Sequence, residues 1–362
     1  MRRIPVSSRS LGSDSPALPP ERAALSDTPA ATAPGRLTLV RWLLLALRVG
    51  PALVLLLLIG AMSLLSPVFA TTQNIGNVLS QTAVIAVLAI GQLLVILTRG
   101  IDLSVGSTLA LSAVVGAMTF EAAGSGVLTV LAMLAAGLAV GAVNGIVFVF
   151  GRLPHPFIIT LATLSVGRGI ALGLSDGQPI QGMPGFVQTI GGGSIGWFPY
   201  SALLVAGVAG VIAIMLTRFV WGRWIYAVGG NPEGARRTGI PSRGVLVSVY
   251  VVSGLLAGVG AVITAGRLNA GSPTFGDLAE LDAIAAVVIG GASFLGGRGH
   301  VGHALVGALM IGVIRNGMNL LNIEAYIQLI VIGTVIVLAV ESDVVRSRLE
   351  ERFRVLAAAS HG

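Results

Sequence analysis

The chain has 362 residues, of which 54% are hydrophobic and 10% are charged, and its mean hydropathy is +0.92. A soluble domain usually carries roughly a quarter of its residues as charges, so this composition excludes an ordinary soluble fold. The net charge of +7 does not indicate a nucleic-acid partner, because all 22 basic residues are arginines that lie between apolar runs rather than on one face. A chain without cysteine forms no disulfide, thiolate metal site or cysteine nucleophile.

The first segment, residues 1–36, is rich in Ser, Pro, Ala and Arg. This composition buries too little apolar area to offset the entropy of ordering, so we expect a disordered cytoplasmic tail. Arg2 and Arg3 could open a twin-arginine signal, but a polar, proline-rich stretch follows where such a signal has an apolar core. We therefore expect no cleaved signal.

About ten apolar runs follow, each close to the roughly 20 residues that a helix needs to cross a bilayer. They predict an all-α polytopic membrane protein with its transmembrane domain at 37–343 and a cytoplasmic C-terminal tail at 344–362. The expected spans are 42–65, 77–97, 103–120, 127–150, 157–174, 200–220, 245–265, 283–295, 301–321 and 325–340. The eighth is short, which favours a broken or partly re-entrant segment.

The arginines orient these spans, because cytoplasmic loops of membrane proteins collect positive charge. With both termini inside, most loop arginines fall on the cytoplasmic side, whereas acidic residues such as Glu121, Asp176 and Glu324 fall outside with Arg267 as the lone cation. We therefore expect a multi-pass protein of a bacterial inner (plasma) membrane with both termini in the cytoplasm.

Glycines spaced four apart, at Gly137, Gly141 and Gly145, predict a face where two helix backbones approach closely in lipid. A solute path lined by glycine is the alternative interpretation of the same spacing.

A faint internal echo links the two halves of the chain. The Asp-containing tripeptides 101–103 and 281–283 each open a span, and Asn-Gly pairs recur at 144–145 and 316–317. An offset of five spans reverses the direction through the membrane, as in an inverted repeat of two five-helix halves with the solute path between them. The echo rests on these two short matches.

The stretch 226–241 predicts a helix of about two turns with both ends marked. An amide cap, a proline and an acidic residue mark its start, and two arginines, a glycine and a proline mark its end. These residues are Asn231, Pro232, Glu233, Arg236, Arg237, Gly239 and Pro241. So short a helix is marginal alone in water. It therefore rests on its own membrane domain or docks into a separate cytoplasmic subunit, and the residues leave both alternatives open.

Several stretches carry a family resemblance: 100–107, 153–164, 226–241, 253–258, 281–297 and 316–321. Together they resemble the permease family of bacterial ABC importers for monosaccharides of the ribose/xylose type. The stretches at 100–107 and 281–297 are long enough to be specific. The departures from the family pattern are the N-terminal tail and His155, which is inserted between Pro154 and Pro156 in the loop before the fifth span.

The resemblance implies a permease that pairs with a second copy, as a homodimer, or with a close relative. It also implies separate ATPase subunits and an extracytoplasmic sugar-binding protein as partners. The family's coupling helix, at about 231–240, matches Asn231, Pro232, Glu233, Ala235, Arg236, Arg237, Thr238 and Gly239. ATP and Mg²⁺ would be bound by the partner ATPase, and the residues agree, because a Walker phosphate loop needs a lysine and this chain has none.

Six polar residues are candidates for the translocation path: Asp102, Ser104, Asn144, Asp282, Asn316 and Asn319. The favoured interpretation of Asp102, Ser104 and Asp282 is helix capping; the alternative is direct contact with a hydroxyl-rich solute. Arg168 and Arg315 fall inside predicted spans, where a charge is costly enough to suggest function unless the side chain reaches the interface.

Other classes of protein fit less well. His300 and His303 could share a helix face, but a metal site needs more ligands, so we expect a solvated loop and no metal. An ion-coupled secondary transporter would usually carry buried acidic or histidine side chains at span centres, which the expected spans lack. The sequence also shows no constellation of catalytic residues of the kind that a membrane enzyme needs. Within the ABC class, a permease for nucleosides or branched-chain amino acids is the nearest alternative.

Overall fold

The computed structural model describes the backbone of residues 34–359 and the side chains of residues 50–341, 343 and 344. Its contacts divide the chain into Met1–Trp42 and Leu43–Gly362, and the features below lie in the second part. Most of the tail predicted at 1–36 falls outside the described residues.

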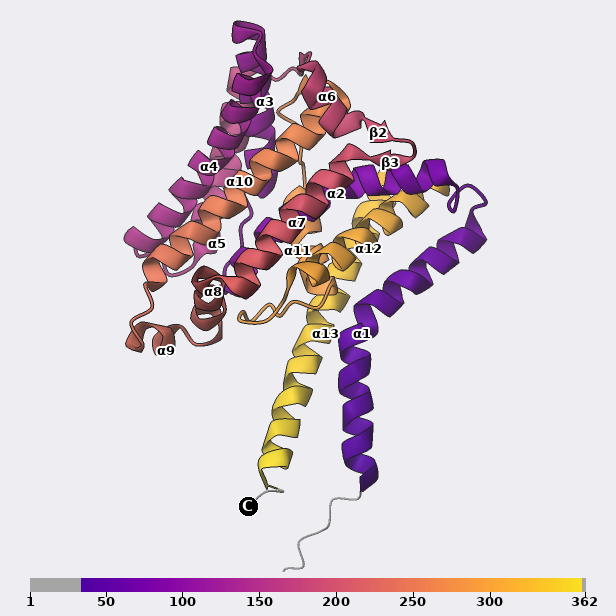
Figure 1. The fold of residues 1–362 in the computed structure, drawn as a ribbon, viewed down its shortest axis with the longest axis vertical. Coiled ribbons are helices and arrows are strands. Elements are labelled where there is room, and N and C mark those ends of the chain that lie inside the picture. Colours follow the sequence, from indigo (N-terminus) through magenta and orange to yellow (C-terminus); the bar gives the residue numbers. More distant parts are fainter. Residues whose placement is uncertain (1–33, 360–362) are drawn as a thin grey trace, which may run out of the picture. The chain divides into compact units, whose positions relative to one another are not determined.

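In the described part of the chain the structure is built from helices, with only two-residue strands between some of them (Figure 1). The helices are α1 (Pro34–Leu65), α2 (Thr72–Leu97), α3 (Val105–Ala123), α4 (Gly126–Phe150), α5 (Pro156–Leu174), α6 (Gly185–Gly192), α7 (Tyr200–Arg218), α8 (Val220–Gly230), α9 (Pro232–Arg237), α10 (Ser242–Leu268), α11 (Ala279–Ile289), α12 (Val301–Leu320) and α13 (Ala325–Ala359). Strand β1 (Ile180–Gln181) pairs antiparallel with β4 (Ala270–Gly271), and β2 (Ser194–Ile195) pairs antiparallel with β3 (Phe198–Pro199).

Seven described helices are long and apolar enough to cross a membrane, namely α2, α3, α4, α5, α7, α10 and α12. They correspond to seven of the expected spans and confirm the all-α polytopic class. The eighth expected span is α11, which has only 11 residues, as its short apolar run predicted. The first and tenth correspond to shorter apolar stretches within α1 and α13, Gly50–Leu65 and Ala325–Glu341, so the expected number of ten is approximate.

Helix α10 is the centre of the packing and lies against α4 along its length (Figure 1). The glycines of the two helices face one another: a Cβ on Gly254 would lie 2.8 Å from the Gly141 Cα, and one on Gly258 would lie 2.9 Å from the Met133 carbonyl oxygen. A Cβ on Gly145 would lie 2.9 Å from the Val247 Cα. The spacing of four residues between glycines therefore serves close helix packing, as predicted, rather than a solute path.

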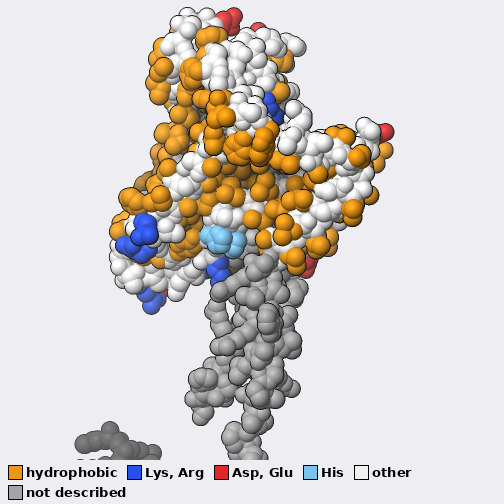
Figure 2. All heavy atoms as spheres, turned by 45° about the vertical axis from the view of Figure 1, so that its right-hand side comes forward, with side chains coloured by type: hydrophobic (Ala, Val, Ile, Leu, Met, Phe, Trp, Pro, Cys, Tyr) orange, Lys and Arg blue, Asp and Glu red, His pale blue; other side chains and the backbone are white. Residues whose placement is uncertain are grey.

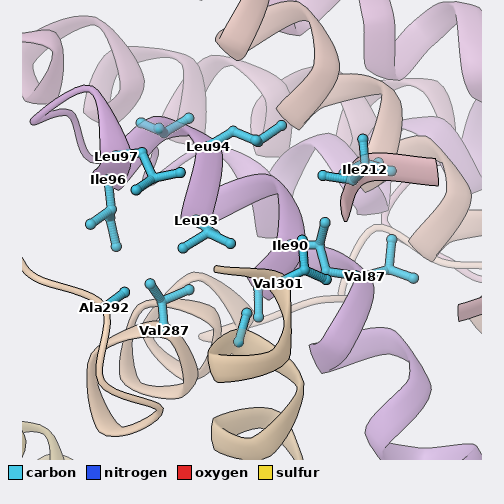
Figure 3. Packing of buried hydrophobic residues seen from close by; sticks show 14 of the residues in the cluster. Val87, Ile90, Leu93, Leu94, Ile96, Leu97, Ile212, Val287, Ala292 and Val301 are labelled. Atoms are coloured by element: carbon cyan, nitrogen blue, oxygen red, sulfur yellow. The ribbon is translucent and has the colours of Figure 1, made fainter. Parts of the chain in front are cut away.

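The apolar core is densest where the second half of α2 meets α11 and α12. Leu93, Leu94 and Leu97 are fully buried there, and Figure 3 shows Leu93 facing Val287 and Val301. Because α2 is buried on all sides in this half, it carries no polar face between Leu93 and Leu97.

Apolar side chains cover most of the face seen in Figure 2, which is the pattern of a surface that contacts lipid. Exposed residues on α4, α5 and α7 include Leu131, Phe150, Val166, Val211 and Ile214. In the same view, arginines gather at the end that also carries the histidines.

Candidate functional site

The short helix predicted at 231–240 is present as α9, from Pro232 to Arg237. Asn231 caps it as expected, because its Oδ1 accepts a hydrogen bond of 2.9 Å from the Gly234 N–H. After the last turn, Gly239 takes the left-handed conformation with φ of 81°. The flanking helix α8, at Val220–Gly230, was not expected from the sequence.

Helix α9 rests on its own membrane domain by one side chain, Ala235, which is buried in the main core cluster. Glu233 and Arg237 form an ion pair of 2.6 Å across one turn on the outer face. The exposed residues among those matched to the coupling helix are Asn231, Pro232, Glu233, Arg236, Arg237, Thr238 and Gly239. The helix thus presents a charged surface to whatever lies beyond it.

Three predicted path residues, Asp102, Ser104 and Asn144, lie together in a closed polar cluster. Asp102, only 1% exposed, accepts from the Ser104 N–H at 3.0 Å and the Ser104 hydroxyl at 2.7 Å through Oδ1. Its Oδ2 accepts from the Ser253 hydroxyl of α10 at 3.0 Å. The Gln92 amide of α2, oriented with its nitrogen toward the Asp102 carbonyl, pairs with the Asp102 backbone at 3.1 and 3.2 Å.

Asn144 extends this cluster to α4 and α5. Its Nδ2 donates to the Ser104 hydroxyl at 2.8 Å, and its Oδ1 accepts from the Thr163 hydroxyl at 2.7 Å. We call the set formed by Gln92, Asp102, Ser104, Asn144, Thr163 and Ser253 the Asp102 cluster. It joins four helices, α2, α4, α5 and α10, to the segment that precedes α3. Its donors and acceptors pair with one another in this structure, as buried polar groups usually do. The role of Asp102, Ser104 and Asn144 in the translocation path stays a prediction.

A second group of polar side chains surrounds a cavity of about 570 Å³ between α2, α10, α11, α12 and α13. The cavity lies at the end of these helices away from α9, beside the starts of α2 and α11 and the ends of α10 and α12. Its polar lining consists of Asn77, Ser80, Gln81, Thr264, Arg267, Asp282, Arg315, Asn319 and Gln328. Two of the predicted path residues, Asp282 and Asn319, are therefore in a place where a solute can reach them.

Asp282 and Arg315 form an ion pair within this cavity. Nη2 of Arg315 donates to both carboxylate oxygens of Asp282, at 2.8 and 2.7 Å, and the two side chains are 30% and 8% exposed. Asn319 accepts from the Gln328 amide at 2.8 Å across the same cavity. Arg315 thus has a partner within the span, so its charge is paired and does not need to reach the interface.

The remaining predicted path residue, Asn316, is not among the residues that line the cavity. Its amide exchanges two hydrogen bonds of 2.9 Å with the Asn74 amide at the start of α2, and both residues are buried. The sequence analysis missed Asn74, Gln92, Ser253 and Gln328, since single amides and hydroxyls in apolar runs carry no local sign of their distant partners.

Two other charged candidates have structural roles. Arg168 of α5 binds the loop before α11 by donating to the carbonyls of Pro273 and Phe275, the latter at 2.9 Å, and lies 3.9 Å from Asp277. His300 caps α12 and stacks on His303 with ring centroids 3.4 Å apart, and burial lowers the pKa of His300. Among the described residues, no three His, Asp or Glu side chains group as metal ligands.

Comparisons with known proteins agree on one family. A family model described as the permease component of the branched-chain amino acid transport system matches residues 74–340. The chain is 42% identical over 297 residues to the ribose import permease of Escherichia coli K12, covering 80% of this chain and 91% of the relative. No solved structure matches the chain.

Two further relatives are permeases named for different sugars. The chain is 39% identical over 300 residues to the D-allose transport permease of Escherichia coli K12, covering 81% of this chain and 90% of the relative. It is 34% identical over 343 residues to the L-arabinose ABC transporter permease of Azospirillum brasilense, covering 94% of this chain and 100% of the relative. By these matches and its membrane-spanning helices, the chain belongs to the permease family of ABC importers, among the permeases of the monosaccharide type.

Proposed function

We propose that this chain is the membrane-spanning subunit through which a bacterial ABC importer moves a monosaccharide inward, driven by ATPase subunits on other chains. The proposal rests on one observation, which is that the two ends of the fold carry different features. One end holds a polar cavity, and the other presents a short, capped and charged helix. The relatives named above are permeases for ribose, D-allose and L-arabinose.

The size and polar lining of the cavity suit a small, hydroxyl-rich solute. Its volume of about 570 Å³ falls within the roughly 300–1,000 Å³ typical of small-molecule sites. Amide, hydroxyl, carboxylate and guanidinium groups line it, so it offers both hydrogen-bond donors and acceptors to sugar hydroxyls. Asp282 and Arg315 neutralise one another in it, whereas Arg267, which also lines the cavity, donates to the Ser80 carbonyl at 3.5 Å and adds one positive charge.

The position of the cavity favours an outward-open arrangement. The α9 end carries the gathered arginines (Figure 2), which the positive-inside rule assigns to the cytoplasm. The cavity at the opposite end then faces outward, toward an extracytoplasmic binding protein. Below it, the packed side chains of Leu93, Val287 and Val301 close the way to the cytoplasm (Figure 3).

Helix α9 is proposed as the contact with the ATPase. It is anchored through Ala235 while its charged residues remain exposed, so it can transmit force without supplying chemistry. ATP and Mg²⁺ would be held by the partner, and a second permease copy would complete the membrane unit as a homodimer. Closure of the ATPases would then switch access from the outer to the inner side, a change between two states.

The decisive experiment is sugar uptake into proteoliposomes that contain this chain, its ATPase and its binding protein, with ATP inside and each component omitted in turn. We expect uptake only with all three, and a panel of pentoses, hexoses, nucleosides and branched-chain amino acids identifies the substrate. Uptake by this chain alone down a proton or sodium gradient would contradict the proposal.

The docking surface is tested by reversing charge on α9. Glu233→Lys breaks the exposed pair with Arg237, which contributes only about 0.3–0.5 kcal/mol, so the protein should stay folded. We expect it to lose ATP-driven uptake and to bind the ATPase less, and Arg236→Glu to behave alike. The matched control is Glu121→Lys, the same change on an exposed residue at the opposite end of the fold. Normal uptake by the α9 variants would remove the docking assignment.

A further inference from the structure

One small region joins the segment before α9 to the helices around the cavity. There the end of α2, the end of α8 and the loop 291–299 between α11 and α12 meet within hydrogen-bonding distance. The Gly297 N–H donates to the Leu97 carbonyl at 2.9 Å, which fixes the loop to α2. A Cβ on Gly297 would lie 2.8 Å from the Gly230 Cα, so the loop also touches the last residue of α8.

Arg99 crosses this junction with two hydrogen bonds. Its Nε donates to the Gly229 carbonyl at 2.5 Å, and its Nη2 donates to the Gly230 carbonyl at 2.7 Å. Both carbonyls belong to the C-terminal turn of α8, where unpaired carbonyls and the helix dipole favour a cation. Gly230 directly precedes Asn231, the cap of α9, so the guanidinium holds the peptide units from which α9 starts.

The backbone of Arg99 is unusual in a way that fits this role. Its φ is +65°, a left-handed conformation that costs a non-glycine residue energy and that a glycine would adopt freely. The following residue, Gly100, is a glycine, whereas the left-handed position itself carries arginine. An arginine therefore occupies a position where the backbone disfavours a side chain, and its planar fork matches two adjacent carbonyls, as a lysine would not.

We propose that Arg99 is a positioning residue that transmits displacement of α9 to α2 and thereby to the solute cavity. The proposal rests on the proposed function of α9 as the contact with the ATPase. Helix α2 is continuous from Thr72 to Leu97, so a push at its end reaches Asn77 and Gln81 in the cavity lining. A second bond, from the Tyr226 hydroxyl to the Gly299 carbonyl at 2.7 Å, ties α8 to the loop before α12 and keeps the junction in register.

The test compares Arg99→Met, which keeps the apolar stem and removes both donors, with Arg99→Lys, which keeps a charged donor group but loses the planar fork of the guanidinium. The control is Arg152→Met, since Arg152 is an exposed arginine with a left-handed φ of 53° in the loop between α4 and α5. Each variant is reconstituted with its ATPase and binding protein. Co-purification of the ATPase, ATP hydrolysis and sugar uptake are then measured on the same samples.

We expect Arg99→Met to retain the ATPase and hydrolyse ATP, while sugar imported per ATP falls by about 2- to 30-fold, the range found for substitutions along a coupling route. Arg99→Lys should lie between Arg99→Met and wild type, and Arg152→Met should match wild type. An unchanged ratio in Arg99→Met would overturn the proposal. So would loss of the ATPase from that variant, because Arg99 would then be a docking contact. Failure of the wild-type complex to couple uptake to ATP would instead refute the proposed function itself.

Discussion

The Asp102 cluster permits a sharp prediction, because two substitutions at one position separate charge from hydrogen bonding. Asp102→Ala removes the acceptor of three hydrogen bonds and leaves the Ser104 N–H and the hydroxyls of Ser104 and Ser253 without that partner. Asp102→Asn keeps the shape: its oxygen can still accept both Ser104 bonds, and its NH₂ can donate to the Ser253 oxygen, which accepts as readily as it donates.

The magnitudes follow from these contacts. Three donors that lose their bond to the Asp102 carboxyl group, at about 1–3 kcal/mol for each one left buried without a partner, set an upper limit for Asp102→Ala. Ser253 lies within α10 and can turn its hydroxyl to the carbonyl one turn earlier, which recovers one bond. We therefore expect a loss of about 3–5 kcal/mol in unfolding free energy for Asp102→Ala and under about 1.5 kcal/mol for Asp102→Asn.

Thermal unfolding in detergent, followed by the fluorescence of the four tryptophans, measures both variants. Uptake in proteoliposomes is measured alongside at two pH values. An Asp102→Asn protein as unstable as Asp102→Ala would refute the hydrogen-bond argument. A stable Asp102→Asn protein without uptake would mean that the carboxyl group acts in translocation, and the argument against ion coupling from missing buried carboxyl groups would then fail.

Two further predictions concern the cavity and the cap of α12. Arg315→Ala should impair sugar uptake more than Arg315→Ala combined with Asp282→Ala, because the single change leaves an almost buried carboxylate without its partner; uptake that is equal or worse in the double variant would contradict the pairing. Burial lowers the pKa of His300 in the folded protein, whereas in the unfolded chain His300 has the ordinary histidine pKa of about 6.5. At and below pH 6.5 the unfolded chain therefore binds more protons at this residue than the folded protein does, so the stability falls as the pH drops through that value. His300→Asn keeps a good helix cap and should flatten the dependence of the unfolding temperature on pH between about 8 and 5, and an unchanged slope would exclude His300 as its source.

The sequence predicted the spans well because length and apolar content determine them directly. The ends of α9 were also predictable, since Asn231 and Gly239 act on residues only a few positions away. Helix α8 is not predictable in the same way, because its 11 residues are too few for a span and no side-chain cap marks its start. The segment 283–295 shows that the length of an apolar run does not fix the end of a helix. Helix α11 ends at Ile289, and the residues after it form the loop that contacts α2.

The candidate path was predicted only in part, because polar residues in apolar runs look alike whether they pair internally or face a cavity. Asp102 and Asp282 both precede or open a helix, yet Asp102 has Ser104 and Ser253 as partners and Asp282 has Arg315. These partners lie up to 151 positions away in the sequence, and only the fold brings them together. The inverted repeat suggested by the two motifs stays a prediction.

The glycine contact between α4 and α10 has a consequence for how any transport cycle must proceed. At Gly141 and Gly254 the backbones of the two helices touch, with no layer of side chains between them. If one helix slid or tilted against the other, main-chain atoms would overlap. We expect α4 and α10 to move as one rigid body, which keeps its internal geometry while neighbouring helices change position. Spin labels on the lipid side of α4 and α10 would then report a constant separation in every nucleotide state, and a changing one would show that the frame itself deforms.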